Sequence, residues 1–254
     1  GNGNPTTYAS KAATYDDGNR LTSFPNIANT TWAAGYRADN LRSWTQASSS
    51  STLSERVYYY YDGGNAVLEK SNTGTLHAIN VFAPDGLVAR SFNPVLTNPG
   101  PEEEDVQGMV GESYRGDYLF DWQGNATHIL SDAVWPAQGT LIHSAYNAWG
   151  QKNFLYPTNL NNELHRFGYN ARWGYRTDTE TGLVYCQNRY YDPANGRWVT
   201  RDPIGYAGGV NLYSYCGAGP VGAMDPWGLK IKLHTETAEQ LLALQVAIWI
   251  LMLT

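Results

Sequence analysis

The chain has 254 residues, enough for one large domain or two small ones. Its formal net charge is −6 and only 16% of its residues are charged, so it lacks the basic footprint of a nucleic-acid-binding protein. Aromatic residues make up 13% of the chain, and 26 Gly and 12 Pro interrupt it often. This composition is typical of many short strands joined by turns, and it predicts an all-β fold.

The N-terminal segment, GNGNPTTYASK, has no apolar core of the kind that a secretory signal peptide needs. It leads directly into a series of repeats. We therefore expect the chain to be a piece of a longer protein, or a short relative of one.

A short phrase recurs along the first two thirds of the chain. In most copies an aromatic residue is followed by Asp or Asn, and Gly or Asn comes a few residues later. The copies begin at Tyr15, Tyr36, Tyr61, Phe120, Tyr146 and Tyr169. Neighbouring copies lie 21 to 26 residues apart, except for a gap of 59 residues after Tyr61, within which Phe82 begins a weaker copy.

Each copy of the phrase predicts a β-hairpin. Asp, Asn and Gly tolerate the positive φ of tight turns, and the flanking aromatic and β-branched residues suit a half-buried strand. A single hairpin is only marginally stable in water. We therefore expect consecutive copies to pair into one continuous antiparallel sheet.

The C-terminal tail differs in kind. Thr237-x-x-Gln240 fits a capping box, and it predicts a short helix through the apolar stretch that follows. The run Val246–Leu253 is apolar on all sides but shorter than the roughly 20 residues that span a bilayer. A helix buried against the rest of the protein, membrane association and the start of a truncated downstream domain all remain open.

Metal and cofactor sites are not indicated. The histidines are scattered without metal-ligand spacing: His77, His128, His143, His165 and His234. Cys186 and Cys216 lie thirty residues apart and show no zinc pattern, which favours free thiols over a disulfide. The Gly-rich GYAGGV does not follow a strand and open a helix, so we expect no dinucleotide, no other cofactor and no metal.

An Asp-Pro-x-Gly motif occurs twice, at Asp202–Gly205 and at Asp225–Gly228. Pro203 and Gly205 in the first motif, and Pro226 and Gly228 in the second, suit a type I turn on backbone grounds alone. A related turn, ending in Asn, begins at Asp192. Nineteen residues, 206–224, separate the two motifs, which is enough chain to fold back and set the two turns side by side.

The repeat array resembles the YD-repeat (Rhs, rearrangement-hotspot) family. The block from Gly174 to Lys230 is similar to that family's repeat-associated core domain, because TGLVY, NRYYDPANGRW, RDPIG, NLYSY and DPWGL occur in that order within 57 residues. The resemblance covers about nine-tenths of the chain and leaves out only the tail.

The resemblance implies a curved antiparallel β-strip that forms part of a cocoon-like shell and is closed by the core domain. It divides the chain into a shell segment (residues 1–165), a core domain (166–229) and a C-terminal tail (230–254). In bacterial polymorphic toxins and toxin-complex C subunits, such a shell encloses a C-terminal toxin. We therefore expect a secreted or cell-surface protein used in bacterial competition. Its expected partners are the rest of the shell, its own C-terminal segment, and secretion-system or toxin-complex components.

The resemblance also implies an intramolecular aspartyl protease that cuts between Leu229 and Lys230, with Asp202 and Asp225 catalytic. Two close carboxylates would hold one proton between them, so that one activates a water and the other protonates or polarises the peptide. The substrate is part of the same chain, so a modest catalyst suffices. Arg201 would orient the carboxylates or stabilise charge, or else form only a surface pair with Asp202.

Other interpretations remain open. A tail of 25 residues is too short for a toxin enzyme domain, so toxicity is implied only by the resemblance. Whether the two aspartates are active is also undecided. The alternative is a non-catalytic cell-surface or adhesion module in which both motifs are only turns. A shell that binds sugars through its Tyr and Trp residues is a weaker third hypothesis.

Overall fold

The computed structural model describes residues 3–25, 31–48, 55–92, 114–131, 140–156 and 163–234. The helix predicted from Thr237 lies outside these residues. Within the described ranges, no helix is both long enough and apolar enough to cross a membrane.

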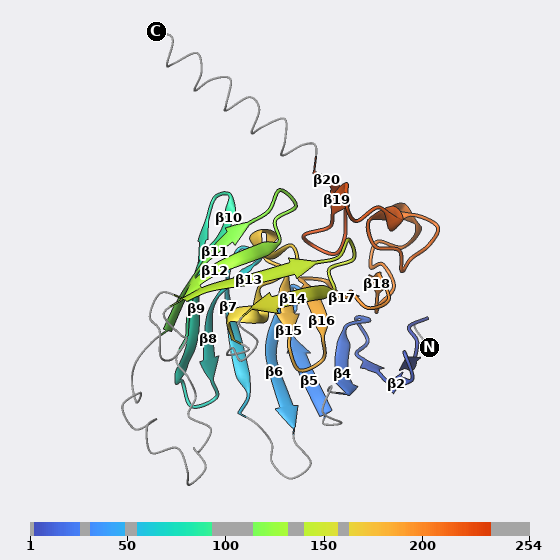
Figure 1. Ribbon diagram of the computed structural model, residues 1–254. Coiled ribbons are helices and arrows are strands. Elements are labelled where there is room, and N and C mark those ends of the chain that lie inside the picture. Colours follow the sequence, from blue (N-terminus) through green and yellow to red (C-terminus); the bar gives the residue numbers. More distant parts are fainter. Residues whose placement is uncertain are drawn as a thin grey trace.

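Among the described residues, one large sheet of twelve strands dominates the fold (Figure 1). Its strands pair antiparallel in unbroken chain order, each with the next, which confirms the predicted antiparallel strip. They are β3 (Thr14–Tyr15), β4 (Leu21–Pro25), β5 (Thr31–Tyr36), β6 (Arg42–Ser48), β7 (Val57–Asp62), β8 (Asn65–Ser71), β9 (Leu76–Ala83), β10 (Gly86–Phe92), β11 (Tyr114–Phe120), β12 (Ala126–Ser131), β13 (Thr140–Tyr146) and β14 (Lys152–Tyr156).

The second residue of the repeated phrase shapes the turn between strands. In three copies its side-chain oxygen accepts hydrogen bonds from the backbone amides two and four residues further on, at 2.9–3.0 Å. These residues are Asp16, Asp121 and Asn147. The weaker copy at Phe82 also forms a hairpin, with β9 ending at Ala83 and β10 beginning at Gly86. The repeat is therefore a turn signal, as the sequence predicts.

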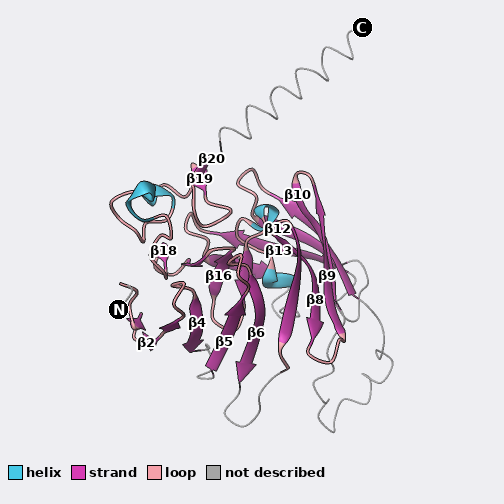
Figure 2. Cartoon of the chain, turned by 180° about the vertical axis from the view of Figure 1, so that it is seen from behind, coloured by secondary structure: helices cyan, strands magenta, loops and turns pink. Residues whose placement is uncertain are grey.

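A smaller sheet of four strands follows the strip and lies inside its curve (Figures 1 and 2). Its strands are β15 (Arg176–Asp178), β16 (Leu183–Cys186), β17 (Arg189–Asp192) and β18 (Arg197–Trp198). Short elements complete the fold: β1 (Thr7–Tyr8), β2 (Lys11–Ala12), β19 (Ala223–Met224), β20 (Lys232–Leu233), and the 3-10 helices η2 (Leu164–Arg166), η3 (Ala171–Trp173), η4 (Gly205–Gly208) and η5 (Cys216–Ala218). The proposed boundaries at residues 165 and 229 stay a prediction.

Apolar packing joins the two sheets. One buried cluster combines Phe24 and Trp32 of the strip with Tyr190 and Val199 from the smaller sheet and the chain that follows it. A second cluster packs strands β9–β13 against Leu164 of η2 and neighbouring residues. The hydrophobic core therefore lies between the strip and the elements inside its curve, and neither part buries its apolar face alone.

Buried ion pairs join the same two layers. Arg42 of β6 is fully buried and contacts Asp178 of β15 at 2.5 Å and the Tyr190 hydroxyl at 2.6 Å. Arg176 of β15 contacts Glu69 of β8 at 2.9 Å. Although burial opposes its ionisation, Glu69 has a pKa well below its usual range because Arg176 and a second arginine lie beside it. A buried charge is costly without its partner, so these pairs tie the smaller sheet to the strip.

Removing the Arg42 guanidinium is expected to destabilise the chain far more than removing an exposed one. In Arg42→Met, Asp178 stays buried without its nearest counter-charge, so we expect the free energy of unfolding to fall by about 3–5 kcal/mol. The control is Arg37→Met, because Arg37 pairs with Asp39 at the surface and should contribute no more than about 1 kcal/mol. Urea unfolding measures both changes, and equal losses would contradict this account.

Candidate functional site: two Asp-Pro-x-Gly turns around Arg189

Both Asp-Pro-x-Gly motifs form the turns that the sequence predicts. The Gly205 amide donates to the Asp202 carbonyl at 3.0 Å, and the Gly228 amide donates to the Asp225 carbonyl at 3.1 Å. The two glycines have φ of +62° and +64°. Asp202 and Asp225 are buried, with 6% and 2% of their surface exposed, so neither side chain points into bulk solvent.

The first turn is fixed by the chain that folds back over it. The Asp202 amide donates to the Leu212 carbonyl at 2.9 Å, and the Asp202 carboxylate accepts a hydrogen bond from the Ile204 amide at 3.1 Å. Gly208 of η4 lies against the same carboxylate, since a Cβ there would come within 2.6 Å of Asp202 Oδ2. The segment between the motifs therefore covers Asp202.

The second turn is held by side chains of the smaller sheet and its flanks. The Asp225 amide donates to the Tyr175 hydroxyl at 2.9 Å. The Trp227 carbonyl accepts hydrogen bonds from the backbone amide of Asn188 at 3.3 Å and from its side-chain nitrogen at 2.9 Å. These contacts place the turn directly against the start of β17.

Arg189, the first residue of β17, joins the two turns. Its Nη1 lies 3.0 Å from Asp202 Oδ2, and its Nη2 lies 3.0 Å from Asp225 Oδ2. Its Nε donates to the Gly228 carbonyl at 2.6 Å, and the guanidinium lies over the ring of Trp198 at 4.1 Å. One buried, planar cation therefore holds both carboxylates and the backbone of the second turn.

The two predicted aspartates lie close to the same side chain. The sequence predicted that they share a proton, whereas in the structure both contact the Arg189 guanidinium. Arg201, the predicted partner, is exposed, and its backbone amide donates to Asn4 Oδ1 at 3.1 Å. A catalytic role for Arg201 stays a prediction. Arg189 was not predicted from the sequence, although an arginine among the aromatic residues of NRYYDPANGRW would be costly to bury without acidic partners.

Asp225 also contacts the predicted cleavage link. Its Oδ1 accepts hydrogen bonds from the amide of Leu229 at 2.9 Å and from the amide of Lys230 at 3.0 Å. The Lys230 nitrogen is half of the Leu229–Lys230 peptide bond. One carboxylate therefore contacts Arg189 through one oxygen and this peptide bond through the other.

Burial raises the pKa of Asp225 above the usual carboxyl range, while Arg189 and the amides of Leu229 and Lys230 oppose the shift. Because the folded chain then binds this proton more tightly than the unfolded chain, stability falls as pH rises from the ordinary carboxyl pKa through the raised one. The raised pKa also keeps a proton on Asp225 at a pH where an exposed aspartate has lost it.

Aromatic side chains and two cysteine thiols surround Asp202 and Asp225. Cys186 and Cys216 are both buried and free. Burial raises the pKa of both, to about 12 for Cys216, so neither is an activated nucleophile. In the part of the chain that the structure describes, no group of three or more His, Cys, Asp or Glu side chains is arranged to hold a metal ion.

Adding a methyl group at Gly228 is expected to separate the second turn from Arg189. A Cβ at Gly228 would lie 2.8 Å from the Cys186 carbonyl oxygen and 3.1 Å from the Arg189 amide nitrogen. We expect Gly228→Ala to lower the free energy of unfolding by about 3 kcal/mol. Both the strain of a positive φ and the steric overlap of the new methyl group contribute to this loss.

The matched control is Gly205→Ala, which has nearly the same φ but no atom within 4 Å of the added methyl. It should lose only about 1 kcal/mol, the strain of a positive φ by itself. Denaturant unfolding of both variants compares the two positions. If the losses are equal, the close approach of the second turn to β17 is wrong.

Comparison with known proteins identifies relatives over most of the chain. No family model matches it. It is 30% identical to double-stranded DNA deaminase toxin A of Burkholderia cenocepacia over 69% of this chain and 12% of that one. It is 28% identical to toxin subunit YenC2 of Yersinia entomophaga (70% and 20%), and 36% identical to the probable deoxyribonuclease RhsA of Dickeya dadantii (45% and 8%).

Solved structures show the same fold. The crystal structure of TcdB2-TccC3 superposes with a TM-score of 0.67 at 21% identity, over 89% of this chain and 11% of that one. The chain spans a fifth or less of the length of each of these proteins.

Proposed function

The chain belongs to the Rhs and toxin-complex family of shell proteins, and from this we propose that it forms the C-terminal part of a shell that encloses a toxin segment. We further propose that its core domain cuts the chain once, between Leu229 and Lys230. The observation that carries the second proposal is the position of Asp225, which contacts the Lys230 amide and shares the Arg189 guanidinium with Asp202.

The strip supports the shell proposal. Its strands follow one another in a single curved sheet, and the described part ends in two strands, β3 and β14, that each pair on one side only. An open strand edge invites pairing with another strand, so the rest of a longer shell would continue the sheet. By analogy with the toxin subunit YenC2, the assembled protein would act outside the producing cell with other toxin-complex or secretion components.

The pair Asp202 and Asp225 supports a single hydrolytic step. In this step Asp202 takes a proton from a water, whose oxygen bonds to the Leu229 carbonyl carbon. The bond from that carbon to the Lys230 nitrogen breaks, and a protonated Asp225 gives its proton to this nitrogen. The raised pKa of Asp225 suits it to be the acid, and its Oδ1 lies 3.0 Å from the leaving nitrogen. In the uncleaved chain this oxygen accepts from the Lys230 N–H, so the proton is given only after attack at the carbonyl carbon has made the nitrogen lone pair basic.

Arg189 is a positioning residue in this step. It balances the negative charge that remains on the two carboxylates, and its bond to the Gly228 carbonyl orients the backbone just before the cut peptide. The nucleophile and the peptide belong to one folded chain, so no binding entropy is lost at the moment of reaction.

The segment after the cut would stay attached without a covalent link. Its β20 pairs antiparallel with β19, with Lys232 opposite Met224 and Leu233 opposite Ala223. The His234 amide adds a hydrogen bond to the Gly222 carbonyl at 3.0 Å. Residues 230–254 would therefore remain bound to the core domain after cleavage, with a new amino terminus at Lys230.

Intact-mass spectrometry under denaturing conditions tests the cleavage directly. We expect the purified chain to separate into residues 1–229 and a peptide of residues 230–254, while size exclusion before denaturation shows one species. Asp202→Asn and Asp225→Asn should each leave the chain whole, because each variant removes one half of the acid–base pair.

Asp192→Asn is the matched control. Asp192 begins the third Asp-Pro turn and accepts a hydrogen bond from the Ala194 amide at 2.8 Å, as Asp202 does from the Ile204 amide, whereas Arg189 pairs with Asp202 and Asp225. The substitution should leave cleavage intact. If the unsubstituted chain stays whole at every pH at which circular dichroism shows it folded, the motifs are only turns and the chain is a non-catalytic shell or cell-surface module.

A further inference from the structure

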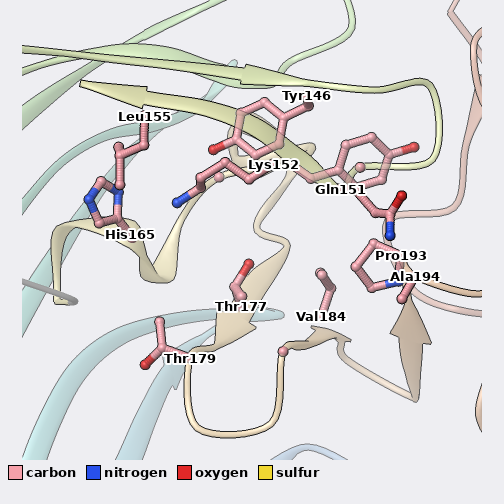
Figure 3. Close-up of a pocket in the computed structure, with 14 residues that line it drawn as sticks. Tyr146, Gln151, Lys152, Leu155, His165, Thr177, Thr179, Val184, Pro193 and Ala194 are labelled. Carbon is pink, nitrogen blue, oxygen red and sulfur yellow. The ribbon is translucent and has the colours of Figure 1, made fainter. Parts of the chain in front are cut away.

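A cavity of about 410 Å³ lies away from the two turns, between the end of the strip and the smaller sheet (Figure 3). The hairpin of β13 and β14 forms one wall, η2 forms the second, and β15 and β16 form the third. Asp202, Asp225 and Arg189 are not among its lining residues. The cavity has the size of a small-ligand site, and the autoproteolysis proposed above makes no use of it.

An exposed lysine contributes a positive charge to the lining of this cavity. The ammonium group of Lys152, the first residue of β14, extends over the space between η2 and β15 in Figure 3. Lys152 has no ion-pair partner among the described residues, and none of the residues that line the cavity is acidic. Although Lys152 is an exposed residue, the neighbouring walls partly desolvate its ammonium group and lower the pKa of Lys152 to about 8. A negative group inside the cavity would restore its favourable environment.

A buried histidine beside it also lacks a partner. His165 of η2 is 6% exposed, and its Nε2 makes no hydrogen bond to any described residue. Burial and the charge of Lys152 lower the pKa of His165 to about 4, so the ring is neutral near pH 7. A buried polar nitrogen without a partner is unfavourable, which suggests that something else completes this site.

The rest of the lining is apolar with a few hydroxyl groups. Leu155, Val184 and Pro193 supply aliphatic surface, and Thr177 and Tyr146 supply hydroxyls. The hydroxyl of Tyr146 lies beside Gly168, since a Cβ at that glycine would come within 2.6 Å of it. One end of the cavity therefore suits an anion and the rest suits a compact apolar group.

We propose that this cavity binds a carboxylate carried on a compact apolar group. One carboxylate oxygen would accept from the Lys152 ammonium, and the other would accept from His165 or a nearby hydroxyl. Two sources share this chemistry: the C-terminal residue of a polypeptide, and a free small organic acid. The proposal concerns a second site and does not depend on cleavage at Leu229.

Isothermal titration calorimetry on the full chain distinguishes the sources. The free-acid probe is 3-phenylpropionate, with 3-phenylpropionamide as its neutral match. The peptide probe is acetyl-Gly-Gly-Phe with a free C-terminal carboxylate, matched by the same peptide as its amide. In at least one of the two probe pairs, we expect the carboxylate to bind at least about tenfold more tightly than the amide. The reason is that the amide cannot form the charged hydrogen bond. The preferred pair identifies the source.

Substitution and pH locate the binding. Lys152→Met should weaken carboxylate binding by about tenfold, and the control Lys70→Met, in β8 with its ammonium over the exposed Tyr60 ring, should leave it unchanged. The affinity should fall as pH rises through about 8, the pKa of Lys152, since the ammonium loses its charge. The other titratable groups of the lining are His165, Tyr146 and Tyr169. Equal binding of acid and amide, no binding of any probe, or unchanged binding in Lys152→Met would each overturn the proposal.

Discussion

The arrangement of the site depends on one buried guanidinium between two buried carboxylates. Without Arg189, Asp202 and Asp225 would be two like charges removed from water at close range, and at least one of them would have to be neutral. With Arg189 in place, each carboxylate has a partner at 3.0 Å, and the second turn is held by a further bond from Nε to Gly228. Because Arg189 lies in β17, the register of the small sheet sets the position of the whole site.

Buried arginine–carboxylate pairs also occur where the small sheet meets the strip. Arg42 reaches from β6 to Asp178, and Arg176 reaches from β15 to Glu69, both in fully desolvated surroundings. Such pairs add little net stability compared with apolar packing, but they penalise any arrangement in which a partner is missing. The strip therefore positions the small sheet, the small sheet positions Arg189, and Arg189 positions the two turns. If only some of these contacts form, the chain buries charges that have no partner.

Local patterns made the hairpins and the turns predictable. Asp16, Asp121 and Asn147 cap their own turns with hydrogen bonds to amides two and four residues away, and such contacts depend only on neighbouring residues. Arg189 was not predicted, because its contacts cross 13 and 36 residues of sequence and depend on how β17 pairs with its neighbours. Proximity in sequence pointed to Arg201 instead. The cavity at Lys152 and His165 was also missed, since it forms only where the edge of the strip meets η2.

A carbon-13 NMR titration of the Asp225 carboxyl group tests the central claim most directly. The measurement uses the Asp202→Asn chain, which should keep its peptide bond intact, with and without Arg189→Met. The account predicts that the pKa of Asp225 lies above that of an exposed aspartate and rises further when the guanidinium is removed, because the opposing charge is lost. An ordinary pKa that does not respond to Arg189→Met would show that the two groups do not meet.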